Sequence, residues 1–212
     1  MSIAHIRKEY QKATLDEREA PANPIALFDT WFHDAIRAEV AEPNAMCLST
    51  AGDGKHPEAR IVLLKGFSQE GFEFYTNYHS QKGQALMANP FCSLTFFWPE
   101  VERQVRINGE SVKLSQEESD AYFASRPRGS QIGAWVSQQS ERLESREQLE
   151  QRLKETKASF EDKDIIRPPH WGGYRIIPSQ IEFWQGRPNR LHDRLLYERI
   201  TNTAWDLVRL SP

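Results

Sequence analysis

The chain has 212 residues and a formal net charge of −3, with 39% hydrophobic and 27% charged residues. This composition excludes general disorder and favours a soluble globular protein, which we expect to form one domain over residues 1–212. The acidic balance argues against a nucleic-acid surface, and no apolar run is long enough for a membrane span, so we expect a cytoplasmic protein that binds neither.

The first twenty residues are polar and charged, which predicts an N-terminal arm outside the core. Asn23 and Pro24 then provide an N-cap and a first helical residue. Apolar residues follow at helical spacing, namely Leu27, Phe28, Trp31, Ala35 and Ile36. We expect an amphipathic helix that packs on the core through these residues.

From Ala45 the pattern changes to that of consecutive antiparallel strands, about seven or eight in all. Glycine-rich turns are expected at 52–54 and 69–71, and Asn108-Gly109 is the strongest hairpin signal in the chain. The segments that read as strands are 45–50, 59–67, 72–77, 91–98, 103–114, 172–178, 180–186, 191–199 and 203–210. Cys47 and Cys92 lie apart within these segments and without metal-ligand spacing, so we expect reduced core cysteines and no metal site.

Helices are expected between these strands. A short helix covers 80–90, a second begins with a capping box formed by Ser115 and Glu118, and a charged third helix runs from about 145 to 160. The predicted fold class is therefore mostly antiparallel β, a barrel with peripheral α-helices (α+β). Neither a Rossmann glycine motif nor a P-loop is present in the sequence.

Several cationic residues stand where they could bind anions. Arg60 and Lys65 are roughly 16 Å apart along an extended strand, and their odd spacing directs them to opposite faces, which suits two different anions or two sites that meet at an interface. An equal alternative is that both residues are ordinary charges at the ends of a strand and bind no ligand. Lys82 lies near the start of the short helix, where free N–H groups favour a phosphate, although ordinary capping explains the same pattern.

Two further groups combine hydrogen-bonding and cationic side chains. Tyr122 and Arg126 are four residues apart on one helical face, with Ser130 shortly beyond, and the three could converge on one phosphate. Arg187, Arg190, His192 and Arg194 crowd one strand-like segment, and the last three alternate onto one face. Because like charges repel, this face favours a site with an anionic or electron-rich partner over a solvated surface strand. A nucleic-acid groove is the other interpretation, and the acidic net charge weighs against it.

Seven segments together resemble pyridoxamine 5′-phosphate oxidases: RIVLLK, FYTN, RQVRINGE, SRPRGSQIGAWVSQQS, HWGGYRI and IEFWQG with RLHDR. Their joint occurrence in this order, over nearly the whole chain, is specific. The resemblance implies an FMN-binding split β-barrel and a homodimer with FMN at the subunit interface. It also implies oxidation of pyridoxamine 5′-phosphate or pyridoxine 5′-phosphate by O2 to pyridoxal 5′-phosphate, with H2O2, and NH3 from the amine.

The resemblance also implies site residues. Those that resemble the cofactor-binding positions are Arg60, Ile61, Val62, Leu63, Leu64, Lys65, Tyr75, Thr76, Gln81, Lys82, Gln104, Gln139, Ser140, Trp184 and Arg194. Those that resemble the substrate-binding positions are Arg7, Lys8, Glu9, Tyr10, Lys65, Tyr122, Arg126, Ser130, Arg190, Leu191 and His192. Arg190 and His192 resemble the catalytic pair: Arg190 holds the substrate against the flavin, while His192 contacts ring substituents or assists proton movement. Arg194 is implied to balance charge at the flavin N1/O2 edge.

One position departs from the family pattern. Where the family commonly has Arg-Lys after the serine of the phosphate turn, this chain has Gln81-Lys82, which removes one positive charge from the implied FMN phosphate site. Two other functions remain as alternatives. A split-barrel flavin reductase would consume NAD(P)H, and a B6-phosphate binding protein would bind without turnover.

Overall fold

The structure is a computed structural model that describes residues 2–5, 8–52 and 56–212. These residues form nine strands, five α-helices and one 3₁₀ turn. The strands are β1 (Ala45–Thr50), β2 (Glu58–Leu63), β3 (Gly66–Ser68), β4 (Gly71–Asn77), β5 (Phe91–Trp98), β6 (Arg103–Lys113), β7 (Trp171–Gln185), β8 (Asp193–Arg199) and β9 (Trp205–Leu210). The helices are α1 (Pro24–Arg37), α2 (Gln81–Ala88), α3 (Gln116–Ser125), α4 (Arg128–Val136) and α5 (Arg146–Ser159), and the 3₁₀ turn is η1 (Pro188–Arg190).

The strands form one antiparallel sheet in the order β2-β1-β5-β6-β7-β4-β3, with β8 and β9 added beside β7. The long strand β7 divides the sheet: its first half pairs with β4 and its second half with β8. The sheet curls because the chain crosses directly from one edge to the other. Leu64 N–H still donates to Asn44 next to β1, whereas Lys65 N–H donates to Glu73 of β4 at 2.8 Å. The result is the predicted split barrel.

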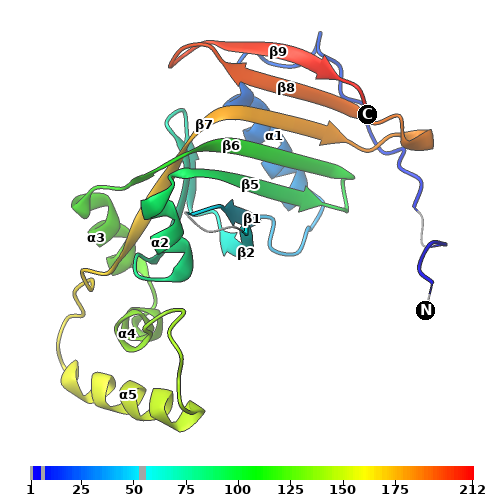
Figure 1. Cartoon of the computed structure of the whole chain (residues 1–212). Helices are drawn as coiled ribbons and strands as arrows, with labels where there is room; N and C mark the ends of the chain where they lie inside the picture. The colour runs from blue at the N-terminus through cyan, green and yellow to red at the C-terminus, as the bar shows by residue number, and fades with distance from the viewer. Residues whose placement is uncertain (1, 6–7, 53–55) are drawn as a thin grey trace.

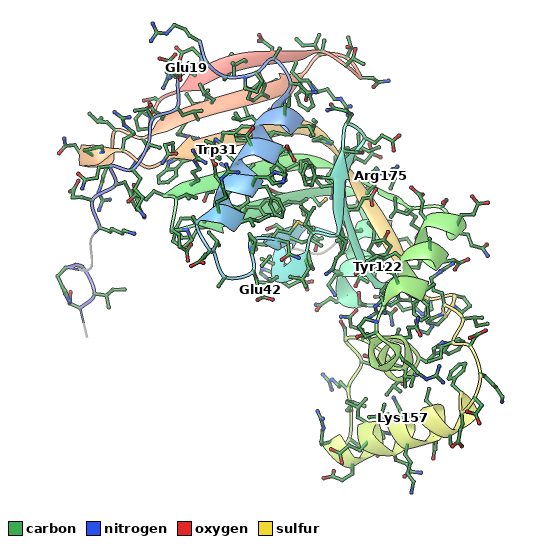
Figure 2. All side chains as sticks on the ribbon, turned by 180° about the vertical axis from the view of Figure 1, so that it is seen from behind. Glu19, Trp31, Glu42, Tyr122, Lys157 and Arg175 are labelled. Atoms are coloured by element: carbon green, nitrogen blue, oxygen red, sulfur yellow. The ribbon has the colours of Figure 1, made fainter. Side chains whose placement is uncertain are left out.

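Helix α1 covers one face of the curled sheet (Figures 1 and 2). Asn23 caps it and Pro24 is its first residue, as predicted. Phe28 and Trp31 are buried, and they meet Phe72, Phe96 and Phe183 of the sheet with ring centroids 4.9 to 5.2 Å apart. Burial of these aromatic side chains provides most of the apolar contact between helix and barrel. Ile36 was expected in this contact, but it is 48% exposed because it lies on the outer side of the last turn.

Helices α3, α4 and α5 lie to one side of the barrel (Figure 1), and a second hydrophobic core is formed where they pack together with the start of β7. Its buried members include Phe123, Ile132 and Trp171, and Leu149 and Leu153 of α5 pack against it. The predicted capping box of Ser115 and Glu118 begins α3. We call α3, α4 and α5 the helical group. It packs against Trp171, the first residue of β7.

Asn108-Gly109 does not form the predicted hairpin. Strand β6 continues through both residues, and its pairing with β7 shifts register there, which is a β-bulge. Glycine is required for a different reason than a turn: a Cβ at Gly109 would lie 2.3 Å from the carbonyl oxygen of Ile177. Close approach of two backbones and a hairpin turn both select glycine, so the local sequence does not distinguish them.

Four other expectations also needed correction. The N-terminal arm is not wholly outside the core, since Leu15 is buried in the main hydrophobic cluster. The segment 59–67 is two strands, because the chain changes partners at Leu64 and Lys65. The segments 172–178 and 180–186 are one strand, β7. Cys47 is only half-buried, whereas Cys92 is buried, which raises the pKa of its thiol to about 12. Among the described residues, no helix combines the length and apolarity needed to cross a membrane.

Candidate functional site

A cavity of about 710 Å³ lies where the split between β2 and β4 meets the helical group; we call it the basic pocket. Twelve of its lining residues are residues that the sequence assigned to the site. They are Arg60, Ile61, Val62, Leu63, Lys65, Tyr75, Thr76, Lys82, Tyr122, Arg126, Ser130 and Gln139, with Pro127 and Trp171 in addition. Four of the lining side chains are cationic and none is a carboxylate. A pocket with this lining is suited to anions.

Lys82 is the most deeply buried of these cations, with 8% of its surface exposed. Its ammonium lies 3.4 Å from the Ser80 hydroxyl, and no described carboxylate pairs with it. Burial, and secondarily the positive charge of Arg60, lowers the pKa of Lys82. An anion between Lys82 and Arg60 would relieve both effects, because it compensates the buried charges.

Arg126 presents a buried guanidinium nitrogen, Nη1, without a hydrogen-bond partner among the described residues. Its guanidinium lies 4.4 Å from the ring centroid of Trp171, and burial lowers its pKa. The sequence placed Tyr122 and Arg126 on one helical face, but α3 ends at Ser125 and Arg126 continues in extended backbone. The two side chains still line the same pocket, since the chain turns around its edge before α4.

Tyr122 of α3, labelled in Figure 2, stacks on Tyr75 of β4 with ring centroids 3.8 Å apart. Trp171 continues the stack beside Tyr75 at 5.7 Å. Burial raises the pKa of Tyr75 to about 12, so this phenol stays protonated at neutral pH. The aromatic stack forms a fixed wall beside the cations and gives the helical group a direct contact with the barrel.

Arg60 and Lys65 line the same pocket, although strand alternation predicted opposite faces. The prediction was wrong because β2 ends at Leu63, and the bend at residues 64–65 changes the direction in which Lys65 points. Leu64 itself is buried in the barrel core and does not line the pocket. Two separate anions can therefore occupy one continuous cavity.

Gln81 and Ser140 lie at the rim. The Gln81 backbone N–H donates to the Ser140 hydroxyl at 3.2 Å, and the Gln81 side chain turns away from the pocket to Glu58. Thr76 donates to Gln139 at 3.2 Å, which connects the end of β4 to the segment after α4. Ser140 has a φ of 74°, an uncommon value for serine that fixes the direction of this segment.

A second cavity of about 510 Å³, the histidine pocket, lies at the far end of β7. Its lining residues are Lys8, Glu9, Tyr10, Arg187, Asn189, Arg190 and His192. Tyr10 of the N-terminal arm seats against Gly186, where a Cβ would lie 2.7 Å from the tyrosine Cβ. Of the other predicted substrate residues, Leu191 is exposed and does not line this pocket, and Arg7 falls outside the described residues.

His192 packs on Trp184, with ring centroids 4.5 Å apart. The backbone N–H of Arg187 donates to His192 Nδ1 at 3.1 Å, so Nδ1 is an acceptor and the proton of the neutral ring is on Nε2. Burial first, and then the charge of Arg190, lowers the pKa of His192. His192 therefore presents a neutral ring whose Nε2–H is a hydrogen-bond donor.

The predicted strand face of Arg190, His192 and Arg194 does not exist. Residues 188–190 form η1, and β8 begins only at Asp193. Asn189 and Arg190 have φ values of 57° and 62°, a left-handed conformation that is costly for non-glycine residues. This strain turns Arg190 toward the pocket while Arg194 remains on the sheet, where it pairs with Glu182 at 2.8 Å.

Three predicted cofactor residues form a row across the sheet. Gln104 of β6, Trp184 of β7 and Arg194 of β8 are register neighbours, on the face opposite α1. Within the described chain no helix lies over this face of β5, β6, β7 and β8 (Figure 1). The face also carries exposed apolar side chains, since Phe97 is 53% and Ile61 is 67% exposed.

The two pockets lie at opposite ends of β7. Trp171 at its start lines the basic pocket, and Gln185 at its end precedes the histidine pocket. A strand of 15 residues spans roughly 45 Å when extended. Both views place η1 and the helical group on opposite sides of the molecule (Figures 1 and 2). One chain therefore does not bring its two groups of predicted residues together.

Sequence reasoning missed several residues around the pockets. Trp171, Asn189 and Glu58 were assigned no site role. Trp171 stands directly before two glycines, which was the available signal that another group approaches its backbone. Nothing local marks Glu58 or Asn189, since their positions depend on the bend after β2 and on η1.

Two family models match this chain. "Pyridoxamine 5'-phosphate oxidase" matches residues 32–160, and "Pyridoxine 5'-phosphate oxidase C-terminal dimerisation region" matches residues 171–212. Among curated relatives, the pyridoxine/pyridoxamine 5′-phosphate oxidases of Paraburkholderia phytofirmans and Gloeothece citriformis are each 56% identical to it. Each alignment covers 100% of this chain and 99% of the relative.

Solved structures agree in fold. PhzG from Burkholderia lata, in complex with tetrahydrophenazine-1-carboxylic acid, superposes with a TM-score of 0.86 at 33% identity, covering 92% of this chain and 95% of its own. A pyridoxamine 5′-phosphate oxidase-related, FMN-binding protein from Nostoc punctiforme superposes with a TM-score of 0.71 at 16% identity, covering 91% and 100%. At that lower identity the likeness concerns the fold alone.

Proposed function

The chain belongs to the pyridoxamine 5′-phosphate oxidase family, and from this premise we propose that it is an FMN-dependent oxidase of pyridoxamine 5′-phosphate or pyridoxine 5′-phosphate. The reaction uses O2 and yields pyridoxal 5′-phosphate with hydrogen peroxide, and the amine also takes up water and releases ammonia. One observation carries the proposal: four cations line the basic pocket, and neither the buried Lys82 nor the half-buried Arg126, whose Nη1 is buried, has an anionic partner among the described residues.

The chemistry of these donors fits two phosphates. Arg60, Lys82 and Thr76 would hold the phosphate of FMN near the start of α2, where the helix dipole adds favourable potential. Lys65, Arg126 and Ser130, with the Tyr122 hydroxyl, would bind the phosphate of the substrate. The substrate phosphate lies away from the reacting carbon. Its binding therefore orients the substrate, since binding energy from a remote group fixes the position of the ring.

FMN, when bound, supplies the acceptor for the hydride that leaves C4′ of the substrate and passes the electrons to oxygen. Arg190, turned inward by its left-handed backbone, holds the substrate ring in place. His192 donates a hydrogen bond from Nε2 to a ring substituent, because its Nδ1 is engaged by Arg187. Tyr10, seated on Gly186, covers the ring and excludes water.

We further propose that each complete site is formed by two copies of the chain. The basic pocket of one protomer would face Gln104, Trp184, Arg194 and the histidine pocket of its partner, with FMN between them. The separation of the two pockets along β7 supports this, as does the exposed apolar face of the sheet. The match of residues 171–212 to a dimerisation region, which covers β7 to β9, supports a homodimer.

The test is an absorbance spectrum of the FMN-loaded protein before and after anaerobic addition of pyridoxamine 5′-phosphate. We expect the flavin absorbance to bleach and to recover when oxygen is admitted. Retained flavin that does not bleach would support the B6-phosphate binding protein, and bleaching by NAD(P)H alone would support the flavin reductase. Equal turnover of phosphorylated and unphosphorylated vitamers would contradict the phosphate assignment of Lys65 and Arg126.

The likeness to PhzG supports a second candidate, oxidation of a tricyclic aromatic carboxylic acid. The anionic group of such a substrate is a carboxylate, whereas that of the vitamer is a phosphate. The buried, unpaired Nη1 of Arg126 beside Lys65 favours the larger and more highly charged phosphate. Tetrahydrophenazine-1-carboxylic acid is therefore the comparison substrate, and faster bleaching by it than by pyridoxamine 5′-phosphate would reverse the assignment.

A further inference from the structure

Arg60 differs from the other cations of the basic pocket because it has a carboxylate partner. Its Nη2 donates to Glu58 Oε2 at 2.8 Å, and its Nη1 donates to the Thr50 hydroxyl at 2.8 Å. In the described part of the chain, Lys65, Lys82 and Arg126 have no such partner. The pocket thus holds one cation that is already neutralised and three that are not.

Glu58 also contacts the start of α2. Its other oxygen, Oε1, accepts a hydrogen bond from the side-chain amide of Gln81, the first residue of the helix. Arg60 and this helix start are the two groups that the proposed function assigns to the flavin phosphate. The carboxylate of Glu58 therefore occupies a place at the edge of the site where a phosphate would find its donors.

Glu58 is free to leave this place. Its side chain is 35% exposed and borders a neighbouring cavity of about 410 Å³ that Gln81, His56 and Gln84 also line. Arg60, at 20% exposure, is more enclosed, and its contact with Thr50 fixes it independently of Glu58. A rearrangement would thus move the carboxylate and leave the guanidinium in the pocket.

We propose that Glu58 is an internal counter-ion that competes with the phosphate of FMN for Arg60. This inference rests on the proposed FMN site. While no phosphate is bound, Glu58 neutralises Arg60 and stabilises the flavin-free protein. When the phosphate binds, the Glu58–Arg60 pair breaks, and a negative charge remains near the phosphate. Glu58 therefore weakens FMN binding and has no such effect on riboflavin, which lacks the phosphate.

The same geometry explains the effect of Gln81. An arginine at this position would offer Glu58 a cation outside the pocket and release Arg60 for the phosphate. The glutamine neutralises nothing, so Glu58 takes its cation from Arg60. Gln81→Arg should accordingly tighten FMN binding, and much of this gain should disappear when Glu58 is already replaced, because the two substitutions relieve the same competition.

The experiment is titration of FMN and of riboflavin into flavin-free protein, followed by flavin fluorescence. We expect Glu58→Gln to lower the Kd of FMN roughly three- to tenfold and to leave that of riboflavin unchanged. We also expect it to lower the melting temperature of the flavin-free protein. Glu150→Gln is the matched control, since Glu150 pairs with Arg146 on the exposed surface of α5.

An unchanged or weaker affinity of Glu58→Gln for FMN would overturn the inference, as would an equal gain for riboflavin. The proposed function fails separately. If the wild-type protein binds neither flavin, the FMN site itself is wrong and the competition falls with it. If the wild type binds FMN and Glu58→Gln binds it no better, only the competition is wrong.

Discussion

The basic pocket and the histidine pocket are built by different means. The basic pocket rests on β2, β4, α2 and α3 and is backed by the second core, so packed side chains set its geometry. The histidine pocket is formed by η1 and the N-terminal arm. The rings of Tyr10, Trp184 and His192 pack together there, and ion pairs and single hydrogen bonds connect the rest of the arm to β8 and to the segment after β7.

Asp193 is the centre of those polar contacts. It accepts hydrogen bonds from the Leu15 backbone at 3.1 Å and from Arg209 at 2.9 Å, and it lies 3.7 Å from Arg187. Its two neighbours in sequence, His192 and Arg194, are both predicted site residues. A packed core suits a pocket whose role is to bind phosphate. Around Asp193, by contrast, a change of charge affects the neighbouring residues at the reacting end of the substrate.

The largest effect on activity is expected when the basic pocket is inactivated in one chain and the histidine pocket in another. Arg126→Ala in the basic pocket and Arg190→Ala in the histidine pocket should each lower kcat/KM about 100-fold or more, since each removes a charged contact to the substrate. When the two inactive proteins are unfolded together and refolded, mixed dimers contain one intact site. We expect recovery of roughly a quarter of wild-type activity.

The control for this recovery is the double variant Arg126→Ala/Arg190→Ala refolded with each single variant. Those mixtures contain no dimer with an intact site, so they should stay inactive. Recovery there, or none in the first mixture despite dimer formation by light scattering, would contradict the shared site.

Local signals predicted the helices well and the strand connections poorly. The caps of Asn23 and Ser115 lie within a few residues of the helices they begin, so sequence determines them. The bulge at Gly109 depends on Ile177, which is distant in sequence, and the bend at Leu64 depends on a change of pairing partner from Asn44 to Glu73. Pairing across a sheet is a tertiary property, and local pattern does not record it.

The same distinction applies to the site. The resemblance assigned nearly all residues that line the basic pocket, because its motifs follow regular elements. It supplied no geometry for η1, where the left-handed backbone of Asn189 and Arg190 replaces the expected strand. It also did not identify Glu58, whose contact with Arg60 depends on how this chain fills the site once Gln81 replaces a cation.

The second prediction concerns the negative charge of Asp193, which connects Leu15, Arg187 and Arg209. Asp193→Asn should lower kcat/KM about tenfold, because the arm and Arg187 lose their common anion while the neutral amide keeps part of the hydrogen bonding. FMN phosphate binding should change little, since the basic pocket is built separately. Steady-state kinetics and FMN titration measure the two effects. Asp29→Asn on α1, an exposed carboxylate, is the control.

The third prediction concerns the contact of Tyr10, in the N-terminal arm, with Gly186. Gly186→Ala would place a Cβ 2.7 Å from the Cβ and Cγ of Tyr10, which must then shift from its position beside Trp184. We expect KM for the vitamer to rise about threefold, within the range of mild overpacking, with little change in kcat. Gly129→Ala is the matched control, because a Cβ there meets no atom within 4 Å. A larger effect of the control would contradict this role of Gly186.

The smallest effect is expected from pH, because the pKa of His192 is already lowered by burial and by Arg190. The neutral ring accepts the Arg187 N–H, and protonation would end that bond, so kcat/KM should decline only as pH falls below the ordinary histidine pKa. In the same range the unfolded chain takes up a proton that the folded chain does not, so the free energy of unfolding should also decrease with falling pH. His192→Gln should lose the acid limb of the pH–rate profile, and His33→Gln, on the exposed side of α1, should keep it. The charge of Asp193 raises the pKa of His192, so Asp193→Asn should move the acid limb of the pH–rate profile to lower pH. A shift of the acid limb to higher pH would show that Asp193 does not act on His192 through its charge.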